Sequence, residues 1–445
     1  MSEKNDDNQH SPETDKTKES EASHQNELSA ALNAINLGTK VVPPIFNLWI
    51  DCLEEIFDWL SINDIHSFGQ TCTKFYQIVG VYFKWKYKRV LGNVYDDSMT
   101  VNWKYLNGFN EFAQRLSFYS REPDRSLLFA LANCKSPKEI NIVNAHFSEL
   151  DIQPFESMLS KIEIMRLSCH LSGEFYESFL GPCANLKRLR IDKSPSNGWM
   201  RNKYPTLEHL EVYECDPSQD NDLKIFLEQN PNVRSLSTTA ELLLRNRVIF
   251  MASNFGLDDL TILRVDDIDL ISIALIELHQ RGFYKRLHFK TDTAKHLDQL
   301  LGLATLRVYR YERIKMPHLP TVKTLVFKAI WNGQCSWMND VSMALNNLER
   351  IFTPKTSTEY ILPFIQNSTK LREITMAGLR GEIDVVAMNN ERKRLKMARK
   401  VTIYLEEKDY LKLKWKHACT DFGLIELKRN KSYDGVWDYT FGSYY

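Results

Sequence analysis

Cysteine and histidine are the residues with which a search for chemistry begins, because thiolates and imidazoles act as nucleophiles, bases and metal ligands. The chain has eight cysteines, and no two of them lie within four residues of each other, so the CxxC pairs of zinc and redox sites are absent. The eleven histidines are scattered, and no pair has a metal-ligand spacing. We therefore expect reduced thiols, no bound metal and no cofactor.

Motifs that carry catalytic chemistry are also missing from the sequence. It contains no GxxxxGK(S/T) phosphate loop, no GxGxxG after a predicted strand, no HExxH zinc motif and no GxSxG nucleophile turn. We therefore expect a protein that binds other molecules, and not an enzyme.

The charge balance limits which partners the whole chain can bind. Its 445 residues contain 57 Lys and Arg against 57 Asp and Glu, which argues against a chain-wide basic footprint for nucleic acid or membrane but leaves room for a local patch. The first residues are polar and acidic, unlike a secretory signal, and no stretch approaches the roughly 18 uncharged apolar residues of a membrane helix. We expect an intracellular protein, in the cytoplasm or the nucleus, without membrane contact.

The elements that could position a binding surface begin after a polar segment. Residues 1–40 hold eight acidic and four basic residues and no aromatic ones. Such a segment cannot bury enough apolar surface to offset its ordering entropy, so we expect a disordered acidic tail. Pro43 and Pro44 then disfavour helix and mark the start of a folded unit.

Three short amphipathic helices are predicted after these prolines. Their apolar positions recur every three or four residues and are Ile50, Leu53, Ile56, Phe57 and Leu60, then Ile65, Phe68 and Cys72, then Phe75, Ile78, Val79, Tyr82 and Phe83. Ser61 and Asp64 have the spacing of a capping box at the start of the second helix. A bundle of about 40 residues buries too little core for independent stability. The rest of the chain or a partner must therefore cover a face of it, and we expect Ile56 and Phe57 on that face.

The same residues resemble an F-box. That motif runs Leu-Pro, a carboxylate, Leu, Ile-Phe, Leu, Asp-Leu and a Cys followed by an aromatic residue, and this chain carries Trp49 where the family usually has proline. The resemblance covers residues 41–90 and implies docking on the Skp-type adaptor of a cullin-RING ubiquitin ligase. The adaptor-binding residues that it implies are Leu48, Trp49, Asp51, Leu53, Ile56, Phe57, Leu60, Asp64, Ile65, Cys72 and Phe75. The alternative is a helical cap on the domain that follows.

From residue 137 the pattern apolar-x-x-apolar-x-apolar recurs. It starts at residues 137, 162, 186, 207, 233, 260, 284, 303, 322, 348 and 371. Most of these intervals fall within the 20–29-residue period of leucine-rich repeats, and segments such as 222–229, 270–279 and 341–348 have helical spacing between the strands. We predict an α/β fold, in which an irregular leucine-rich-repeat solenoid has a parallel concave sheet and helices on the convex side. The alternative is a compact α/β domain.

The predicted domains follow from these segments. They are a disordered tail over 1–40, an F-box over 41–90, linker helices over 91–136, leucine-rich repeats over 137–390 and a C-terminal repeat or capping segment over 391–445. Residues 391–400 include six basic ones and are expected to form a solvated helix face or an exposed loop. Alternation over 401–405 and 424–427 predicts two further strands, and the terminal aromatic residues are expected to cap the solenoid.

Alternate residues of each repeat strand should point away from the helices and line the concave face. The predicted substrate-binding residues on that face are Arg188, Arg190, His209, Tyr213, Arg264, Arg286, His288, Lys290, Arg307, Tyr309, Lys328 and Arg350. Fewer acidic residues share the face, namely Glu139, Asp192, Glu211, Asp266 and Glu373. The basic bias suits an acidic or phosphorylated protein segment.

Together the resemblance and the repeats indicate the substrate-recognition adaptor of an SCF-type ubiquitin ligase, with cullin and RING subunits joined through the Skp-type adaptor. Its substrates would be directed to proteasomal degradation. Two alternatives stay open, a leucine-rich-repeat scaffold outside any ligase and, less favoured, a nucleic-acid binder that uses the concave arginines.

Overall fold

The computed structural model divides the chain into two compact units, unit 1 (Met1–Ile162) and unit 2 (Glu163–Tyr445). The residues that it describes are 45, 48, 50–86, 111–112, 114–118, 134–135, 137–143, 156–168, 173–193, 198–214, 220–263, 265, 268–308, 315–328, 335–417 and 423–429. The predictions for the tail over 1–40, for most of 91–136 and for the terminal aromatic residues lie outside these ranges.

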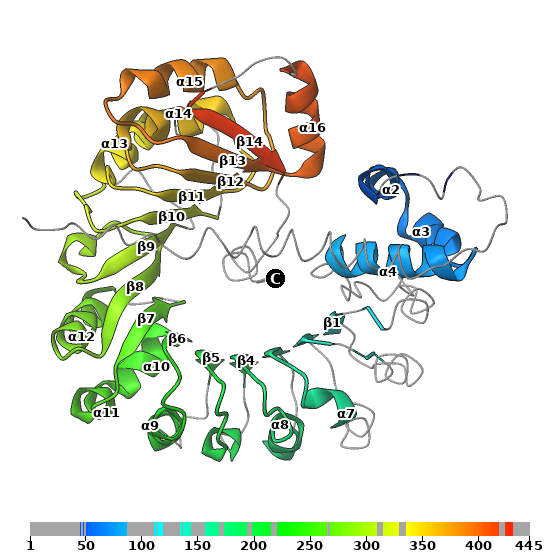
Figure 1. Ribbon diagram of the computed structural model, residues 1–445. Coiled ribbons are helices and arrows are strands. Elements are labelled where there is room, and N and C mark those ends of the chain that lie inside the picture. Colours follow the sequence, from blue (N-terminus) through cyan, green and yellow to red (C-terminus); the bar gives the residue numbers. More distant parts are fainter. Residues whose placement is uncertain are drawn as a thin grey trace, which may run out of the picture. The chain divides into compact units, whose positions relative to one another are not determined.

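Three helices form the core of unit 1 (Figure 1). They are α2 (Ile50–Trp59), α3 (Ile62–Gly69) and α4 (Thr73–Lys86). The hydroxyl of Ser61 accepts a hydrogen bond from the backbone N–H of Asp64 at 3.2 Å and donates one to its carboxylate at 2.6 Å, so the predicted cap does begin α3. The buried core comprises Leu53, Phe57, Ile65, Phe75, Ile78, Val79, Tyr82 and Phe83. The prediction of three amphipathic helices is confirmed.

Phe57 lies at the centre of this bundle. Its ring centroid is 5.4 Å from that of Phe68 and 5.1 Å from that of Tyr82, in edge-to-face arrangements. The hydroxyl of Tyr82 donates to Asp58 at 2.6 Å and so ties α4 to α2. Phe112, from a later segment of unit 1, packs against the same core where Gly80 leaves no Cβ to obstruct its ring. A bundle of this size thus recruits apolar surface from outside its three helices.

Beyond the helices, unit 1 contains strands β1 (Arg115–Phe118) and β2 (Glu139–Val143), which pair in parallel, and the short helix α7 (Glu156–Leu159). The prediction of linker helices over 91–136 is therefore wrong at β1. Its four residues alternate between polar and apolar side chains, and Leu116 is fully buried. A period of two fits a strand and not a helix.

Unit 2 is built on parallel strands that pair in chain order. They are β3 (Ile164–Ser168), β4 (Arg188–Lys193), β5 (His209–Glu214), β6 (Ser235–Thr238), β7 (Leu257–Ile262), β8 (Tyr284–Thr291), β9 (Leu303–Val308), β10 (Thr324–Phe327), β11 (Arg350–Thr353), β12 (Glu373–Met376), β13 (Val401–Leu405) and β14 (Ile425–Arg429). A register shift between Leu287 and His288 interrupts the pairing of β8 with β9.

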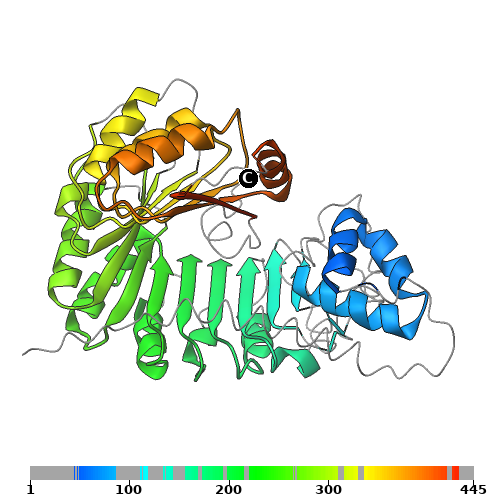
Figure 2. The same ribbon diagram turned by 45° about the horizontal axis from the view of Figure 1, so that its top comes forward.

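Helices connect these strands on one side of the sheet (Figures 1 and 2). They are α8 (Gly173–Leu180), η4 (Gly198–Arg201), α9 (Asp220–Gln229), α10 (Ala240–Arg245), α11 (Arg247–Ala252), α12 (Ile268–Gln280), η6 (Leu297–Gln299), α13 (Cys335–Ala344), α14 (Thr358–Asn367), α15 (Val385–Arg394) and α16 (Glu407–Lys416). Within unit 2 the strands line the inner side of an arc, and most of the helices lie outside it. Residues such as Leu189 and Ile191 bury their side chains between the two layers. The predicted fold class, a helical F-box-like unit followed by a parallel-sheet repeat solenoid, is confirmed.

The predicted register is wrong at one repeat. The pattern was placed at residue 260, whereas β7 spans Leu257–Ile262 and begins it at Leu257. Both placements satisfy the pattern because Leu257, Leu260 and Leu263 are spaced by three. Pairing with β6 and β8 selects the earlier one, so Thr261 holds the row position predicted for Arg264, which lies outside the described residues.

The repeat continues past residue 390. The strands predicted over 401–405 and 424–427 exist as β13 and β14, and α15 and α16 lie between the last three strands along the chain. The expectation of a solvated basic face over 391–400 fails at Arg392, whose side chain is fully buried. Its neighbours Lys393, Arg394 and Lys396 are exposed, as expected.

Candidate functional site

Helix α2 leaves an apolar stripe outside the core of unit 1. Cys52, Ile56 and Trp59 follow one another at positions i, i+4 and i+7, so they share one side of the helix, and we call them the exposed stripe. Cys52 is exposed, Ile56 is 42% exposed and Trp59 is 71% exposed. Large apolar side chains left in water next to a packed core are typical of a surface that another protein covers.

The structure separates Ile56 from Phe57, which were expected on the same uncovered face. Phe57 is 0% exposed, inside the bundle, and only Ile56 faces outward. Successive residues of an α-helix are about 100° apart, so one of two neighbours turns inward when the other faces a partner. The expectation is therefore wrong for Phe57, whose ring holds the helices together.

Most of the other predicted adaptor-binding residues also serve the bundle itself. Leu53, Ile65 and Phe75 are buried in the core, and Leu48, Leu60 and Cys72 are partly buried against it. The exposed carboxylate of Asp64 is occupied by the cap of α3. Trp49 and the side chain of Asp51 lie outside what the structure describes.

On the inner face of unit 2, cross-strand pairing arranges polar side chains in rows. One row, which we call the central row, consists of Arg166, Arg190, Glu211, Ser237, Thr261, His288, Thr305, Thr324, Arg350, Glu373, Thr402 and Glu426. The predicted residues Arg190, His288 and Arg350 lie in it. Two flanking rows carry most of the others, namely Arg188, His209 and Arg286 on one side and Lys290 and Arg307 on the other. Tyr309 lies outside the described residues, and Lys328 directly follows β10.

Charges on β3, β4 and β5 neutralise one another. Arg190 donates from Nε to Asp192 at 2.6 Å and places Nη1 3.1 Å from Glu211, while Arg166 donates to the other oxygen of Asp192 at 3.3 Å. The guanidinium of Arg190 also lies 4.8 Å from the ring centroid of Tyr213. Burial works to raise the pKa of Asp192, but the two arginines outweigh it and hold that pKa below its ordinary value. Arg190, predicted to recognise an acidic ligand, is therefore already committed to carboxylates of its own chain.

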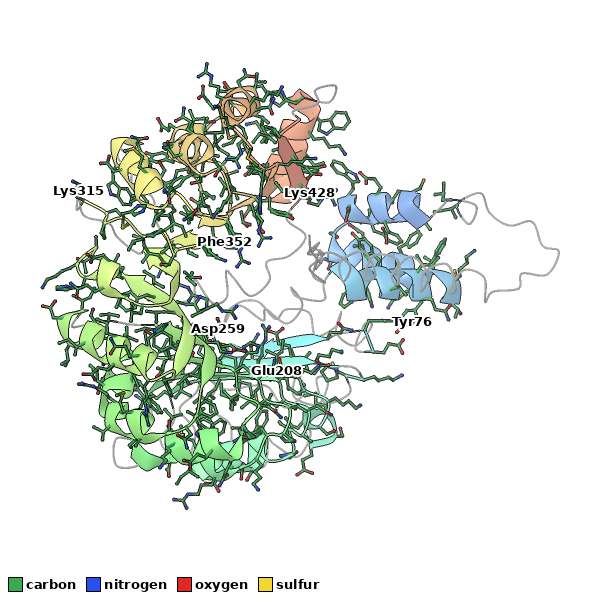
Figure 3. All side chains as sticks on the ribbon, turned by 60° about the vertical axis from the view of Figure 1, so that its left-hand side comes forward. Tyr76, Glu208, Asp259, Lys315, Phe352 and Lys428 are labelled. Carbon is green, nitrogen blue, oxygen red and sulfur yellow. The ribbon has the colours of Figure 1, made fainter. Side chains whose placement is uncertain are left out.

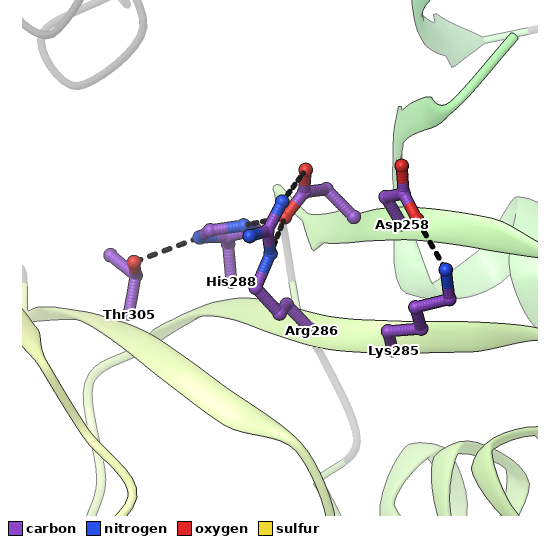
Figure 4. A network of polar contacts seen from close by, with 6 residues as sticks. Asp258, Lys285, Arg286, His288 and Thr305 are labelled. Carbon is purple, nitrogen blue, oxygen red and sulfur yellow. Dashed lines mark hydrogen bonds and ion pairs between the residues drawn. The ribbon is translucent and has the colours of Figure 1, made fainter. Parts of the chain in front are cut away.

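A second network surrounds Asp259 on β7 (Figures 3 and 4). Arg286 donates two hydrogen bonds to its carboxylate, at 2.7 and 2.8 Å, and Nε2 of His288 lies 2.9 Å from it. Nδ1 of His288 lies 2.8 Å from the hydroxyl of Thr305, so the network crosses three strands. Burial works to raise the pKa of Asp259, but the hydrogen bonds from His288 and Arg286 outweigh it, and the pKa lies below its ordinary value. The ionised Asp259 therefore contributes fully to the free energy of unfolding above the pKa of an unfolded Asp, about 3.9. That contribution is lost as the pH falls through the lower pKa of Asp259 in the folded protein.

Asp259, His288 and Thr305 form a chain of polar contacts across three neighbouring strands. Thr305 is 8% exposed and pairs with β8 and β10 on both sides. The network orders the inner face.

Replacing Asp259 with Asn is expected to lower the free energy of unfolding of unit 2 by about 1–2 kcal/mol, because it removes a charged acceptor of three hydrogen bonds on a partly exposed surface. Denaturant unfolding measures the change. The matched control is Asp258→Asn, since Asp258 is partly exposed and pairs with the exposed Lys285, at 2.8 Å, so its loss should leave the melting temperature almost unchanged. Equal losses in the two variants would contradict the role given to the network.

Among the residues that the structure describes, no helix has the length and apolarity to cross a membrane. In the same set of residues, no group of three or more His, Cys, Asp or Glu side chains is arranged to hold a metal ion.

Comparison with known families assigns the helical part of unit 1. Residues 45–87 match the family described as "F-box domain". The chain carries an F-box domain. The match begins before α2 and ends just after α4, so it coincides with the bundle and with the exposed stripe. A comparison with curated proteins finds no match.

Two solved structures share some likeness with the chain at low sequence identity. The crystal structure of the Rad7 and Elc1 complex in yeast is 13% identical, with a TM-score of 0.33, and the alignment covers 84% of this chain and 97% of that one. An internalin (inlF) from Listeria monocytogenes is 10% identical, with a TM-score of 0.27, over 73% of this chain and 84% of that one. Both TM-scores lie below 0.5.

The exposed stripe contains two residues that the sequence analysis missed, Cys52 and Trp59. Trp59 was not among the predicted adaptor-binding residues, although its spacing of three from Ile56 and seven from Cys52 is visible in the sequence. Of the five apolar positions predicted on one face of this helix, Leu53, Phe57 and Leu60 pack inward, whereas Ile56 belongs to the exposed stripe. An α-helix with two apolar stripes buries the better-packed one and leaves the other exposed.

Proposed function

We propose that this chain is the substrate-recognition subunit of an SCF-type ubiquitin ligase. Its F-box domain binds a Skp-type adaptor, which links it to cullin and RING subunits, and unit 2 binds a protein substrate. The chain acts by positioning, since binding raises the effective concentration of substrate lysines near the charged conjugating enzyme. It contributes no catalytic residue, and its substrates proceed to proteasomal degradation.

The observation that carries the adaptor half of the proposal is the exposed stripe on a domain assigned to the F-box family. Trp is the side chain most enriched at the energetic centres of interfaces, and Trp59 presents most of its surface to solvent. Ile56 adds a branched apolar neighbour one turn away. Such a pair resembles the apolar centre of a protein–protein interface whose partner is not bound.

The inner face of unit 2 supports the substrate half. Its rows display Arg, His, Thr and Glu side chains across many strands, a surface on which an extended or folded protein segment makes several hydrogen bonds at once. Because Arg190 and Arg286 are neutralised by neighbouring carboxylates, a preference for acidic or phosphorylated substrate has to come from other basic residues. Arg350, exposed at the start of β11, is one of them.

The double variant Ile56→Ala and Trp59→Ala tests the adaptor half. If both side chains are buried at the adaptor, their truncation should weaken its affinity by about 30- to 1000-fold, the range of paired interface hot spots. The melting temperature should stay within a few degrees, since both side chains are exposed in the free chain and Ala favours helix. Titration calorimetry of the full chain with a purified Skp-type adaptor measures the affinity.

The matched control changes Val248 and Ile273 to Ala, two apolar residues of unit 2 that are 79% and 53% exposed. Adaptor affinity should not change in this variant. Failure of the wild-type chain to bind any Skp-type adaptor would overturn the ligase assignment and leave a repeat scaffold. Unchanged affinity in the Ile56 and Trp59 variant would move the adaptor surface elsewhere on the F-box domain.

A further inference from the structure

Helix α16, between the last two strands of unit 2, has an unusual surface. Its sequence, EKDYLKLKWK, includes four lysines, and all four are exposed. Trp415 is 77% exposed on the same helix. The ammonium groups can bind the acidic groups of a ligand chain, and the exposed Trp can bind an apolar residue of the same chain.

One side of α16 fixes it to the repeats. Leu413 is 3% exposed, and the carboxylate of Asp409 accepts a hydrogen bond from the backbone N–H of Leu379 at 2.9 Å. Lys416 forms an ion pair with Glu382. Asp409, Leu413 and Lys416 lie at i, i+4 and i+7, so these contacts form one stripe along the helix and leave the adjoining side in solvent.

The solvent side repeats the same spacing with different chemistry. Lys408, Lys412 and Trp415 are at i, i+4 and i+7, all exposed, and we call them the α16 stripe. Lys414 lies on another side of the helix, 5.7 Å from the ring centroid of Tyr410. The next strand, β14, contacts α16 and carries the exposed Lys428, which forms an ion pair with Glu426 (Figures 1 and 3). The α16 stripe itself thus carries two lysines and one Trp, and no acidic side chain.

We propose that the α16 stripe binds a short acidic segment of a protein, with carboxylate or phosphate groups on Lys408 and Lys412 and an apolar residue against Trp415. Charge complementarity commits the surface to an anion. The spacing of the stripe, about 10 Å from its first to its last residue, matches a few residues of extended peptide. That this segment belongs to the substrate rests on the function proposed above, whereas the binding itself does not.

Two other anionic surfaces fit this site less well. Duplex nucleic acid requires many phosphate contacts along a continuous basic surface. Here the exposed Glu382 and Asp384 directly precede α15, and Glu382 pairs with Lys416 of α16, so the basic surface is interrupted. Anionic membrane binding needs a broad apolar face, and the α16 stripe has a single large apolar side chain. One aromatic anchor flanked by two lysines suits a peptide.

The test uses the full chain and a fluorescein-labelled peptide of about 14 residues, made of Glu and Asp around one Leu, followed by anisotropy. Binding should weaken by about tenfold or more in Lys408→Glu with Lys412→Glu, and similarly in Trp415→Ala. For the wild type it should also weaken as salt rises from about 0.05 M to about 0.3 M, since exposed pairs are screened. The same peptide with amides in place of its acids should not bind.

The matched control, Lys370→Glu with Lys396→Glu, reverses two exposed lysines that precede β12 and β13 and should bind the acidic peptide like the wild type. Equal binding by the α16 variants and the wild type, or by the amide peptide, would overturn the proposal. The proposal would also be overturned if the wild type bound single-stranded DNA of about 20 nucleotides more tightly than the acidic peptide and the α16 variants lost that binding. The surface would then be assigned to nucleic acid. Affinity for the Skp-type adaptor, measured on the same preparations, should be equal in all variants. If the chain did not bind the adaptor at all, the ligase proposal would be contradicted, but the result with the acidic peptide would still stand.

Discussion

Replacing Arg392 with Met should lower the free energy of unfolding of unit 2 by about 3–5 kcal/mol, because it breaks a buried polar cluster by removing one partner. Arg392 is fully buried and donates only to backbone carbonyls in the bonds that the structure shows. The acceptors are Ile365, Ser368, Thr369, Leu371 and Arg399, at 2.6 to 3.3 Å. Those carbonyls end α14 and lead into β12 and β13, so one guanidinium closes the end of one helix and the entry to two strands.

The charge of Arg392 survives its burial. Burial lowers the pKa of this guanidinium to about 10, so it still carries its proton at neutral pH. Arg392→Lys should recover only part of the loss, since an ammonium has three donors and lacks the planar fork. Arg394→Met, at a side chain that is 74% exposed, is the control and should change the free energy by no more than about 0.5 kcal/mol. Denaturant unfolding measures both changes. If Arg392→Met lost no more free energy of unfolding than Arg394→Met, other donors would have to satisfy the five carbonyls.

The repeat architecture could be predicted from the sequence because each strand alternates and each unit needs its neighbours to bury its apolar side. The exception at residues 257–263 shows the limit of that signal. Leu257, Leu260 and Leu263 support two registers equally, and the choice depends on hydrogen bonding to β6 and β8. A pattern within one segment contains no information about its partners' register.

Side-chain partners were harder to predict than side-chain direction. Strand alternation placed Arg190 and Arg286 on the inner face correctly, but Asp259 was assigned no role there, because the shifted register turned it elsewhere. Arg392 was expected in solvent since a run of six basic residues usually is. Its guanidinium can be buried only because the fold brings five backbone carbonyls close enough to accept its hydrogen bonds.

Changing Phe57 to Ala should unfold the F-box helices without disturbing unit 2. The ring is 0% exposed and contacts Phe68 and Tyr82, so its removal opens a cavity that costs about 3–5 kcal/mol. That is as large as the whole stability expected of a bundle of this size. Hydrogen exchange followed by mass spectrometry should show lost protection of the amides of α2, α3 and α4, and unchanged protection of β4 to β12.

Adaptor binding should then disappear for a different reason than in the Ile56 and Trp59 variant, which keeps its fold. Phe57→Leu fills most of the cavity and should restore both protection and binding to a large extent. A Phe57→Ala protein that retains full protection in α2 to α4 and still loses the adaptor would mean that this ring contacts the adaptor directly. In that case the bundle must open on binding to expose it, since the free chain holds the ring entirely within its own core.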